Sequence, residues 1–434
     1  MRLLYTFLFY LAVPLVLARM LWRGRREPAY RQRWRERFGL YGDSKPTQDA
    51  IWFHAVSVGE AEAAFPLIRA ISRRFPNHPV LVTTTTPTGS ARVRAVLGDA
   101  VAHVYLPYDL PDGVARFLAH FRPTLAVIME TEIWPNLYHA CGLRGIPLAI
   151  VNARLSARSA KGYARMGHFT RDTLTNVNLV AAQTQADAER FLELGASAEA
   201  VVVAGNIKYD LELPDGYFQQ AAGLRQALFG TRPVWVAAST REGEEALVLQ
   251  AFAKLRAHCP GLLLVLVPRH PPRFDKVASL CLTEGLALSR RSLGEGAGNA
   301  EVFLVDTLGE LRLSYAACDV AFVGGSLVPV GGHNVLEPAL AGVPVLFGPH
   351  MFNFAEAGRR LLEAGGALQV ADAEELARRV GELLQDTARA KRMGGKGRAF
   401  VEAGRGALGR VEEALAGLLE ARIRRETLGS DSNG

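Results

Sequence analysis

The stretch "FHAVSVGEAEAAFPLI", Phe53 to Ile68, decides the fold. It begins as an apolar strand, breaks at a glycine and continues with a helical pattern, which is typical of the first strand–turn–helix unit of an α/β domain. The turn is not a dinucleotide-binding loop, because it has the single glycine Gly59 where that fingerprint has three. The next residue, Glu60, puts a carboxylate at a helix N-terminus. Stabilisation of the helix dipole, worth about 0.3–1 kcal/mol, explains Glu60 as well as catalysis does.

Length and composition indicate an ordinary folded protein with two domains. The chain has 434 residues, 49% hydrophobic and 21% charged, and a single core rarely grows beyond about 250–300 residues. Four cysteines lie far apart without a CxxC or Cys/His spacing, so neither a zinc site nor a disulfide framework is indicated. A reducing compartment fits this pattern best.

The positive charge is concentrated near the N-terminus. Eight arginines lie between Arg19 and Arg37, opposed by Glu27 and Glu36, so this segment supplies six of the seven excess charges. The rest of the chain is almost neutral, whereas a nucleic-acid-binding domain has a basic face. We therefore expect no nucleic-acid partner.

An uncharged run, Leu3 to Ala18, precedes the arginines. It covers about 24 Å at about 1.5 Å per residue, against a hydrocarbon core of about 30 Å. A cleaved signal peptide is disfavoured because the positive charge mostly follows the apolar run. A buried first helix of a soluble domain is an alternative. We favour an uncleaved membrane anchor whose arginine-rich flank lies on anionic cytoplasmic lipid.

From Ile51 onward, short apolar runs alternate with helical patterns in two series. The runs of the first series are "IWFHAV", "VLVTTTT", "AHVYL", "TLAVIM", "PLAIV", "NLVAAQ" and "AVVVAG", and those of the second are "PVWVAAS", "LLLVLVP", "EVFLVD", "VAFVGG" and "PVLFG". Such alternation predicts two doubly wound parallel sheets, each buried on both faces. The polar, turn-rich segment "NIKYDLELPDGYFQQ" separates the two series. We expect an anchor at residues 1–22 and Rossmann-like domains at 23–212 and 213–434, whose strands end at a common cleft.

The longest loop after a predicted strand is "FVGGSLVPVGGHNVLEPA". Its four glycines allow backbone amides to approach an anion, and a helix beginning near Asn334 adds the positive end of its dipole. His333 and Glu337 flank it, and Glu337 is placed to accept hydrogen bonds from a ribose. The alternative is that the glycines form tight turns and Glu337 caps its own helix.

Other strand ends carry basic side chains. "VPRHPPRF" offers Arg269, His270 and Arg273 as phosphate partners, and "GNIKYD" offers Lys208, whose alternative role is a surface ion pair with Asp210. In "NARLSARSAKGY", Arg154, Arg158 and Lys161 form a plausible cradle for an anionic acceptor or a solvated helix surface. "STREGEE", from Ser239, reads as an N-cap with an acidic first turn.

Two loops of the first domain carry carboxylates. Glu60 follows the first strand, and Glu130 and Glu132 close a strongly apolar strand in "METEIWP", where carboxylates must find partners. Paired carboxylates indicate acid/base chemistry on a sugar or alcohol.

Together these motifs resemble the 3-deoxy-D-manno-octulosonic acid (Kdo) transferases of Gram-negative bacteria. The segments are "HAVSVGEAEAAFPLI", "METEIWPNL", "NARLSARSAKGY", "GNIKYD", "ASTREGEE", "LVPRHPPRF", "VDTLGEL" and "FVGGSLVPVGGHNVLEPA", in this order. The resemblance implies a GT-B fold with an acceptor-binding and a CMP-sugar-binding domain. It further implies transfer of Kdo from CMP-Kdo to a tetraacylated, bisphosphorylated lipid A precursor, on the cytoplasmic side of the inner membrane, in lipopolysaccharide biosynthesis.

The resemblance also implies roles for individual residues. Glu60 matches the general base of an inverting transfer, and Glu130 and Lys208 match transition-state stabilisers. The matches to CMP contacts are Pro268, Arg269, Gly309, Glu310, Leu311, Asn334, Val335, Leu336 and Glu337. No cofactor is implied, and none of the acidic spacings demands a metal.

Three alternatives stay open at this stage. A related GT-B protein, either a UDP-sugar hexosyltransferase or a sugar-nucleotide epimerase, would share the architecture. A membrane-tethered binding module would share it without turnover. An NAD oxidoreductase is least compatible, because no G-x-G-x-x-G follows a strand with an acidic residue about 20 positions beyond it.

Overall fold

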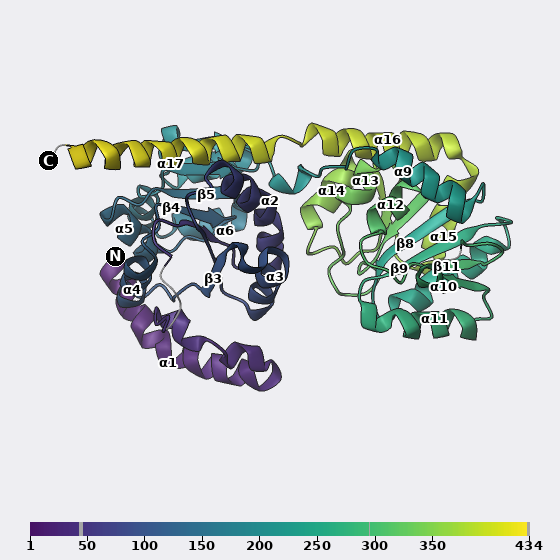
Figure 1. The fold of residues 1–434 in the computed structure, drawn as a ribbon, viewed down its shortest axis with the longest axis horizontal. Helices are drawn as coiled ribbons and strands as arrows, with labels where there is room; N and C mark the ends of the chain where they lie inside the picture. Colours follow the sequence, from purple (N-terminus) through teal and green to yellow (C-terminus); the bar gives the residue numbers. More distant parts are fainter. Residues whose placement is uncertain (43–46, 295, 432–434) are drawn as a thin grey trace. The chain divides into compact units, whose positions relative to one another are not determined.

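The computed structural model describes residues 1–42, 47–294 and 296–431 (Figure 1). The chain forms two compact units, Met1–Asp210 with Arg405–Gly434, and Leu211–Gly404. The boundary at Asp210 falls within the segment "NIKYDLELPDGYFQQ", where the sequence predicts the link. Each unit is an α/β domain with one parallel sheet, so the predicted fold class is confirmed for both halves of the chain.

The first unit contains seven parallel strands in the order β3-β2-β1-β4-β5-β6-β7. Their bounds are β1 Ile51–His54, β2 Val80–Thr84, β3 Ala102–Tyr105, β4 Leu125–Met129, β5 Leu148–Ala153, β6 Leu179–Ala182 and β7 Val201–Val203. Alternate residues of β1 enter different cores. Ile51 and Phe53 pack in one cluster, and Trp52 packs in another on the opposite face. Both faces are therefore buried, as a parallel sheet requires.

Helices connect these strands. They are α2 Val58–Arg74, α3 Pro87–Leu97, α4 Pro111–Phe121, α5 Pro135–Leu143, α6 Ala157–Ala164, α7 His168–Leu174 and α8 Gln185–Glu193. Short 3₁₀ turns include η1 Pro28–Arg31, η2 Trp34–Phe38 and η5 Ile207–Tyr209. Several helices begin with proline at the first position, where the missing N–H leaves no hydrogen bond unmade.

The second unit repeats the architecture, with strand order β10-β11-β9-β8-β12-β13-β14. Its strands are β8 Val234–Thr240, β9 Leu263–Pro268, β10 Leu288–Arg290, β11 Val302–Leu304, β12 Val320–Val323, β13 Val345–Phe347 and β14 Ala367–Gln369. Its helices are α9 Tyr217–Leu224, α10 Glu244–Arg256, α11 Phe274–Thr283, α12 Leu311–Ala316, α13 Leu336–Leu340, α14 Ala355–Glu363, α15 Ala373–Gln385 and α16 Thr387–Ala403.

The C-terminal helix α17, Ala407–Asp431, differs from the expected boundary at 213–434. It packs on the first unit, where Ala407, Val411, Leu415 and Leu419 enter the same core as β1 and α2. Its start is fixed by Asp210, whose carboxylate accepts hydrogen bonds from the backbone N–H groups of Gly406 and Leu408. The chain therefore passes from one unit to the other twice.

The N-terminal helix α1, Arg2–Arg26, is longer than the uncharged run and carries three arginines in its last turn. Among the described residues it is the one helix long and apolar enough to cross a membrane. It belongs to the first unit, where its beginning lies close to α4 (Figure 1).

Candidate active site

Glu60 lies in the first turn of α2, directly after β1. Ser57 caps the helix, since its hydroxyl accepts a hydrogen bond from the backbone N–H of Glu60 at 3.4 Å. The carboxylate of Glu60 reaches back, accepting from the N–H of Val56 at 2.7 Å and from the hydroxyl of Ser57 at 2.9 Å. The bonds between Ser57 and Glu60 are a variant of the capping box, in which Glu60 accepts from the N–H of Val56 and not from that of the N-cap residue, so Glu60 has a structural role at the start of α2.

The same environment also prepares Glu60 for proton transfer. Burial raises the pKa of this carboxyl from 4.5 to about 7, with the negative charges of Glu130 and Glu132 adding to the rise and the hydrogen bond from Val56 opposing it. A carboxylate offers about four lone-pair directions, and the cap uses two. Glu60 can therefore hold its helix and still accept a proton near neutral pH.

Glu130 lies at the end of β4, which is the neighbour of β1. Its backbone adopts a φ of +58°, a left-handed conformation that residues with a Cβ rarely take up. The carboxylate Oε1 lies 3.0 Å from the Nζ of Lys208. The two side chains are about one quarter to one third exposed, at 26% and 34%, so the pair is accessible to a ligand.

A ladder of hydrogen-bonded amide side chains holds η5, the turn that contains Lys208, against β5 and β6. The side-chain N–H of Asn206 donates to Gln183 at 3.0 Å, and that of Gln183 donates to the backbone carbonyl of Asn152 at 2.9 Å. Asn152 then accepts from the backbone N–H of Ile207 through Oδ1 at 3.1 Å. These amides bind η5 to the ends of β5 and β6, and sequence reasoning missed them.

Lys208 pairs with Glu130 and not with Asp210, so the alternative role considered for it, a surface ion pair with Asp210, is not the one in the structure. Glu132, the other carboxylate of "METEIWP", accepts from the indole N–H of Trp134 at 3.0 Å, and burial raises its pKa. Thus Glu60, Glu130 and Glu132 are near enough to influence one another, as the sequence predicts for these two loops.

In the second unit, the glycine-rich loop is already occupied by an internal carboxylate. Glu244 is completely buried at the start of α10 and accepts hydrogen bonds from the backbone N–H groups of Gly325, Ser326 and Leu327 at 2.6, 3.0 and 2.9 Å. The expectation that the backbone amides of this loop can approach a phosphate therefore does not hold for these three, whose N–H groups already donate to Glu244. Nor does "STREGEE" have the expected side-chain N-cap, since Gly243 takes that position, although its acidic first turn is confirmed.

The backbone conformation of the glycines supports the alternative explanation, in which they form tight turns. Gly325, Gly331 and Gly332 all have a positive φ, at 68°, 106° and 71°. The helix expected near Asn334 is α13, which begins at Leu336 and has five residues. The Oδ1 of Asn334 accepts from the backbone N–H of Leu336 at 3.0 Å and so fixes the start of that helix.

Arg269 follows β9 at the end of the buried strand, and its side chain is exposed. It lies near His333, whose pKa falls to about 4 chiefly through burial, with the positive charges of Arg269 and Arg241 lowering it further. His333 is therefore neutral at neutral pH. Glu337 is paired with Arg312 at 3.6 Å and does not act as a side-chain cap of α13.

Two of the expected phosphate or CMP partners form ion pairs with other side chains of the second unit. Arg273 forms a bidentate pair with the buried Glu245, at 2.6 and 2.9 Å. Its guanidinium therefore joins α10 to the turn before α11. Glu310 accepts from the Nε and Nη2 of Arg291, at 3.0 and 2.8 Å. The neighbouring CMP candidates lie on one turn, with Gly309 at a φ of 90° and Leu311 opening α12.

The basic residues of "NARLSARSAKGY" lie on and before α6, in the first unit. Arg154, Arg158 and Lys161 are exposed, and the helix has no buried residue. This placement agrees with both explanations offered above, a cradle for an acceptor and a solvated helix surface.

The chain resembles known proteins along nearly its whole length. Residues 32–211 match the family described as 3-Deoxy-D-manno-octulosonic-acid transferase (kdotransferase). The 3-deoxy-D-manno-octulosonic acid transferase of Haemophilus influenzae is 44% identical over 97% of this chain and 100% of its own length. The transferase of the same description from Bordetella pertussis is 42% identical over 87% of this chain and 90% of its own.

A solved structure shares the two-unit fold. The S. aureus MnaA-UDP complex has a TM-score of 0.53 and 16% identity, covering 84% of this chain and 94% of that one. This likeness concerns the fold alone and agrees with the predicted GT-B class. Sequence identity over the full chain decides the family, and this chain belongs to the 3-deoxy-D-manno-octulosonic acid (Kdo) transferases, a family of glycosyltransferases.

Proposed function

We propose that the chain transfers Kdo from CMP-Kdo to the tetraacylated, bisphosphorylated lipid A precursor, with inversion at the anomeric carbon and Glu60 as the general base. The observation that carries the mechanism is the partly buried carboxyl of Glu60, with a pKa of about 7, beside the Glu130–Lys208 pair at the end of the first sheet. Membership of the Kdo transferase family supports the choice of donor sugar.

The reaction is a direct displacement. The oxygen of a primary sugar hydroxyl attacks the anomeric carbon of Kdo, and the bond from that carbon to the phosphate oxygen breaks. CMP departs with the bonding electrons, and the hydroxyl proton passes to Glu60. A base with a pKa near the working pH is best matched to this transfer.

Glu130 and Lys208 have complementary duties in this proposal. Positive charge develops at the anomeric carbon as the leaving group departs, and the Glu130 carboxylate stabilises it. Negative charge develops on the departing phosphate, and the ammonium of Lys208 stabilises that. Their mutual ion pair at 3.0 Å keeps both side chains in place before substrate binds.

The CMP moiety is assigned to the second unit. Arg269 provides an exposed guanidinium at the end of β9, while Pro268, Gly309, Leu311, Val335 and Leu336 provide backbone and apolar contacts. Glu310 is paired with Arg291, and Asn334 accepts from the first residue of α13, so we assign them to shaping the CMP site as well as to touching CMP. Glu337 is the partner for the ribose.

We place the enzyme on the cytoplasmic side of the inner membrane, held there by α1. An enzyme kept at the membrane surface encounters a substrate anchored there by acyl chains more often, because tethering raises the effective concentration of each for the other. The exposed arginines of Arg19–Arg37 suit both anionic lipid headgroups and a bisphosphorylated acceptor.

Product mass spectrometry tests the proposal. Purified full-length chain is incubated with CMP-Kdo and the lipid A precursor, and the expected product is the precursor plus Kdo, with CMP released. Thermal shift with CMP and with UDP is the accompanying measurement. Equal protection by UDP, or no Kdo adduct, would overturn the assignment and favour a UDP-sugar enzyme of the same fold.

A further inference from the structure

The helix α1 has two faces of different character. One face contains the residues that are shielded by the first unit or by η1, among them Tyr5, Thr6, Met20 and Gly24. The other is a continuous apolar stripe in which every side chain is more than half exposed. We call it the lipid stripe, and it consists of Leu3, Leu4, Phe7, Leu8, Leu11, Leu15, Leu21 and Trp22.

The beginning of α1 is fastened to the first unit by hydroxyl groups. Tyr5 donates to the buried carboxylate of Asp109 at 3.0 Å, and Tyr10 donates to Asp112 at 2.6 Å. Between them, Thr6 donates to the side-chain oxygen of Asn136 at 3.1 Å.

Asp109 is itself part of the fold. It accepts from the backbone N–H groups of Asn136 and Leu137, at 2.9 and 2.8 Å, at the start of α5. The α1 contacts are therefore built into the frame of the first unit.

The end of α1 is fastened to the same unit. Arg31 of η1 folds back and donates to the carbonyl of Leu21 at 3.1 Å. Two residues later Arg33 donates to the carbonyl of His103 on β3 at 2.9 Å, and Glu36 accepts from the N–H of Tyr105 at 2.8 Å. Six residues lie between the last helical residue, Arg26, and Arg33.

These attachments decide the orientation of the helix. At about 1.5 Å per residue α1 is about 37 Å long, which is enough to cross a hydrocarbon core of about 30 Å. Crossing would place its two ends on opposite sides of the bilayer, although both are bound to one folded unit. The contacts of Tyr5, Thr6 and Tyr10 would have to break, leaving the buried carboxylate of Asp109 without the hydroxyl.

We propose that α1 lies in the plane of the membrane interface, docked on the first unit and presenting its lipid stripe to an anionic phospholipid bilayer. This inference specifies the orientation of the proposed membrane anchor, and it rests on the membrane location given under the proposed function. Helices of this kind bury their apolar face about 5–10 Å into the boundary between headgroups and acyl chains. Charge complementarity supports a lipid partner, because exposed arginines gather at the end of the stripe, at positions 19, 23, 25, 26, 31 and 35.

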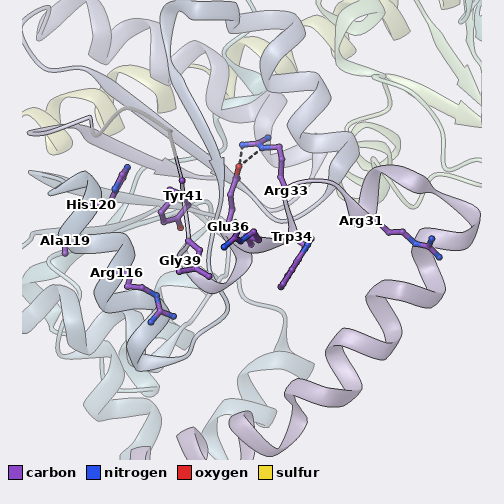
Figure 2. Close-up of a pocket in the computed structure, with 12 residues that line it drawn as sticks. Arg31, Arg33, Trp34, Glu36, Gly39, Tyr41, Arg116, Ala119 and His120 are labelled. Carbon is purple, nitrogen blue, oxygen red and sulfur yellow. Dashed lines mark hydrogen bonds and ion pairs between the residues drawn. The ribbon is translucent and has the colours of Figure 1, made fainter.

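A pocket of about 920 Å³ continues this basic end and is lined by Arg31, Arg35, Arg116, Trp34 and Leu40, among others (Figure 2). Arg33 points from the same segment toward Glu36, with which it pairs at 2.6 Å, whereas Arg31 and Trp34 point away from that pair. Trp34 and Leu40 are each 43% exposed. An exposed tryptophan beside arginines is the composition found where proteins meet lipid headgroups.

Depth measurements test the orientation. A bimane probe is placed singly on cysteine at Leu4, Leu11 or Leu15, in a chain carrying Cys259→Ala because Cys259 is the native cysteine that is not buried. The labelled full-length chain is bound to vesicles of phosphatidylethanolamine and phosphatidylglycerol brominated near either end of the acyl chain. A probe at Glu199, just before β7 at the sheet edge opposite β3, is the control and should stay unquenched.

The expected result is equal quenching at all three α1 positions, strongest from bromines near the carbonyl end. Deepest quenching at Leu11, with shallower values toward the helix ends, would overturn the proposal in favour of a spanning helix. No quenching at any of the three would overturn it in favour of a soluble helix or a contact with a second copy of the chain, which sedimentation separates.

A cross-link provides the second test. Thr6→Cys and Asn136→Cys are joined by a short bifunctional thiol reagent, again with Cys259→Ala. The in-plane helix predicts that the cross-linked chain binds the vesicles as before, whereas loss of binding would show that α1 must leave its site. The quenching assay uses no sugar donor, so a docked, membrane-bound chain that makes no Kdo product contradicts the proposed function and leaves this inference standing.

Discussion

The ammonium of Lys208 lies 3.0 Å from the carboxylate of Glu130, although the two residues are 78 positions apart in the sequence. The pair joins a loop after an inner strand to the turn that follows the edge strand β7, and an amide ladder through Asn152 and Gln183 supports it. Because both side chains are partly exposed, the pair itself adds only about 0.2–1 kcal/mol to the free energy of unfolding.

Substituting either member of this pair should therefore reduce transfer far more than stability. We expect Lys208→Met and Glu130→Gln each to lower kcat by about 100-fold or more, by analogy with the loss of one preorganised electrostatic group, while the melting temperature stays within a few degrees. Kdo transfer kinetics and differential scanning calorimetry check this. Wild-type kcat in either variant would remove the pair from the transition state.

The pH dependence of transfer should report Glu60. Its pKa of about 7 means that the carboxylate needed for proton acceptance is depleted below that pH, so log(kcat/KM) should rise with a slope of about one per pH unit and level off above pH 7. Ser57→Ala removes the hydroxyl that stabilises the carboxylate, so the midpoint should move upward. A midpoint unaffected by Ser57→Ala and by Glu60→Gln would assign the limb to another group.

Glu60 should also affect stability in a defined direction. Because its pKa in the folded chain is above the ordinary value of 4.5, the folded state binds more protons than the unfolded state between pH 4.5 and 7. The contribution of this residue to the free energy of unfolding therefore falls as pH rises through that window. Urea unfolding at several pH values should show a smaller fall for Glu60→Gln than for wild type, and an unchanged fall would contradict the shifted pKa.

Glu244 should control the shape of the glycine-rich loop. Glu244→Gln replaces an acceptor oxygen with an N–H₂ facing backbone N–H groups, so we expect a loss of about 1–3 kcal/mol in the free energy of unfolding and weaker CMP binding. Glu242→Gln is the matched control, because Glu242 lies on the same turn, is exposed and pairs with Lys276. Calorimetric titration with CMP should leave the control unchanged, and equal effects in both variants would contradict the special position of Glu244.

The basic end of α1 should control membrane affinity. Removing Arg31 and Arg35 together should weaken binding to vesicles containing phosphatidylglycerol by about 30-fold, at about 1 kcal/mol for each arginine near an anionic surface, and should have little effect with neutral vesicles. Arg69→Ala with Arg73→Ala, on the exposed side of α2, is the charge-matched control. Equal loss in both double variants would indicate a general charge effect.

Much of the fold can be predicted from the sequence, because strands of a parallel sheet that is covered on both faces consist of consecutive apolar residues. All seven strands of the first unit coincide with such runs, whereas the edge strands β10 and β14 were missed. Each contains polar residues, since β10 is Leu-Ser-Arg and β14 is Ala-Leu-Gln, so no continuous apolar run marks them. The return of α17 to the first unit was missed as well, because an amphipathic helix shows which face is apolar but not which sheet it covers.

The candidate site was predictable where a side chain follows a strand directly. Glu130 and Arg269 are of this kind, and Glu60 lies in the first turn of the helix that follows the first strand. The hydrogen-bonded ladder of Asn152, Gln183 and Asn206 could not be predicted, because the sequence does not show which residue on another strand a polar side chain will bind. The filling of the glycine loop by Glu244 depends on contacts more than 80 positions apart in the sequence, and composition alone could not distinguish it from an open anion site.

The place of α17 has a consequence for biosynthesis. Val411, Leu415 and Leu419 complete the core around β1, yet they lie beyond the second unit in the sequence. The second unit, Leu211–Gly404, is wholly translated before them. On the ribosome, therefore, the unit that starts first finishes last, and a chain stopped near Gly404 would release a complete second unit beside a first unit with an open core.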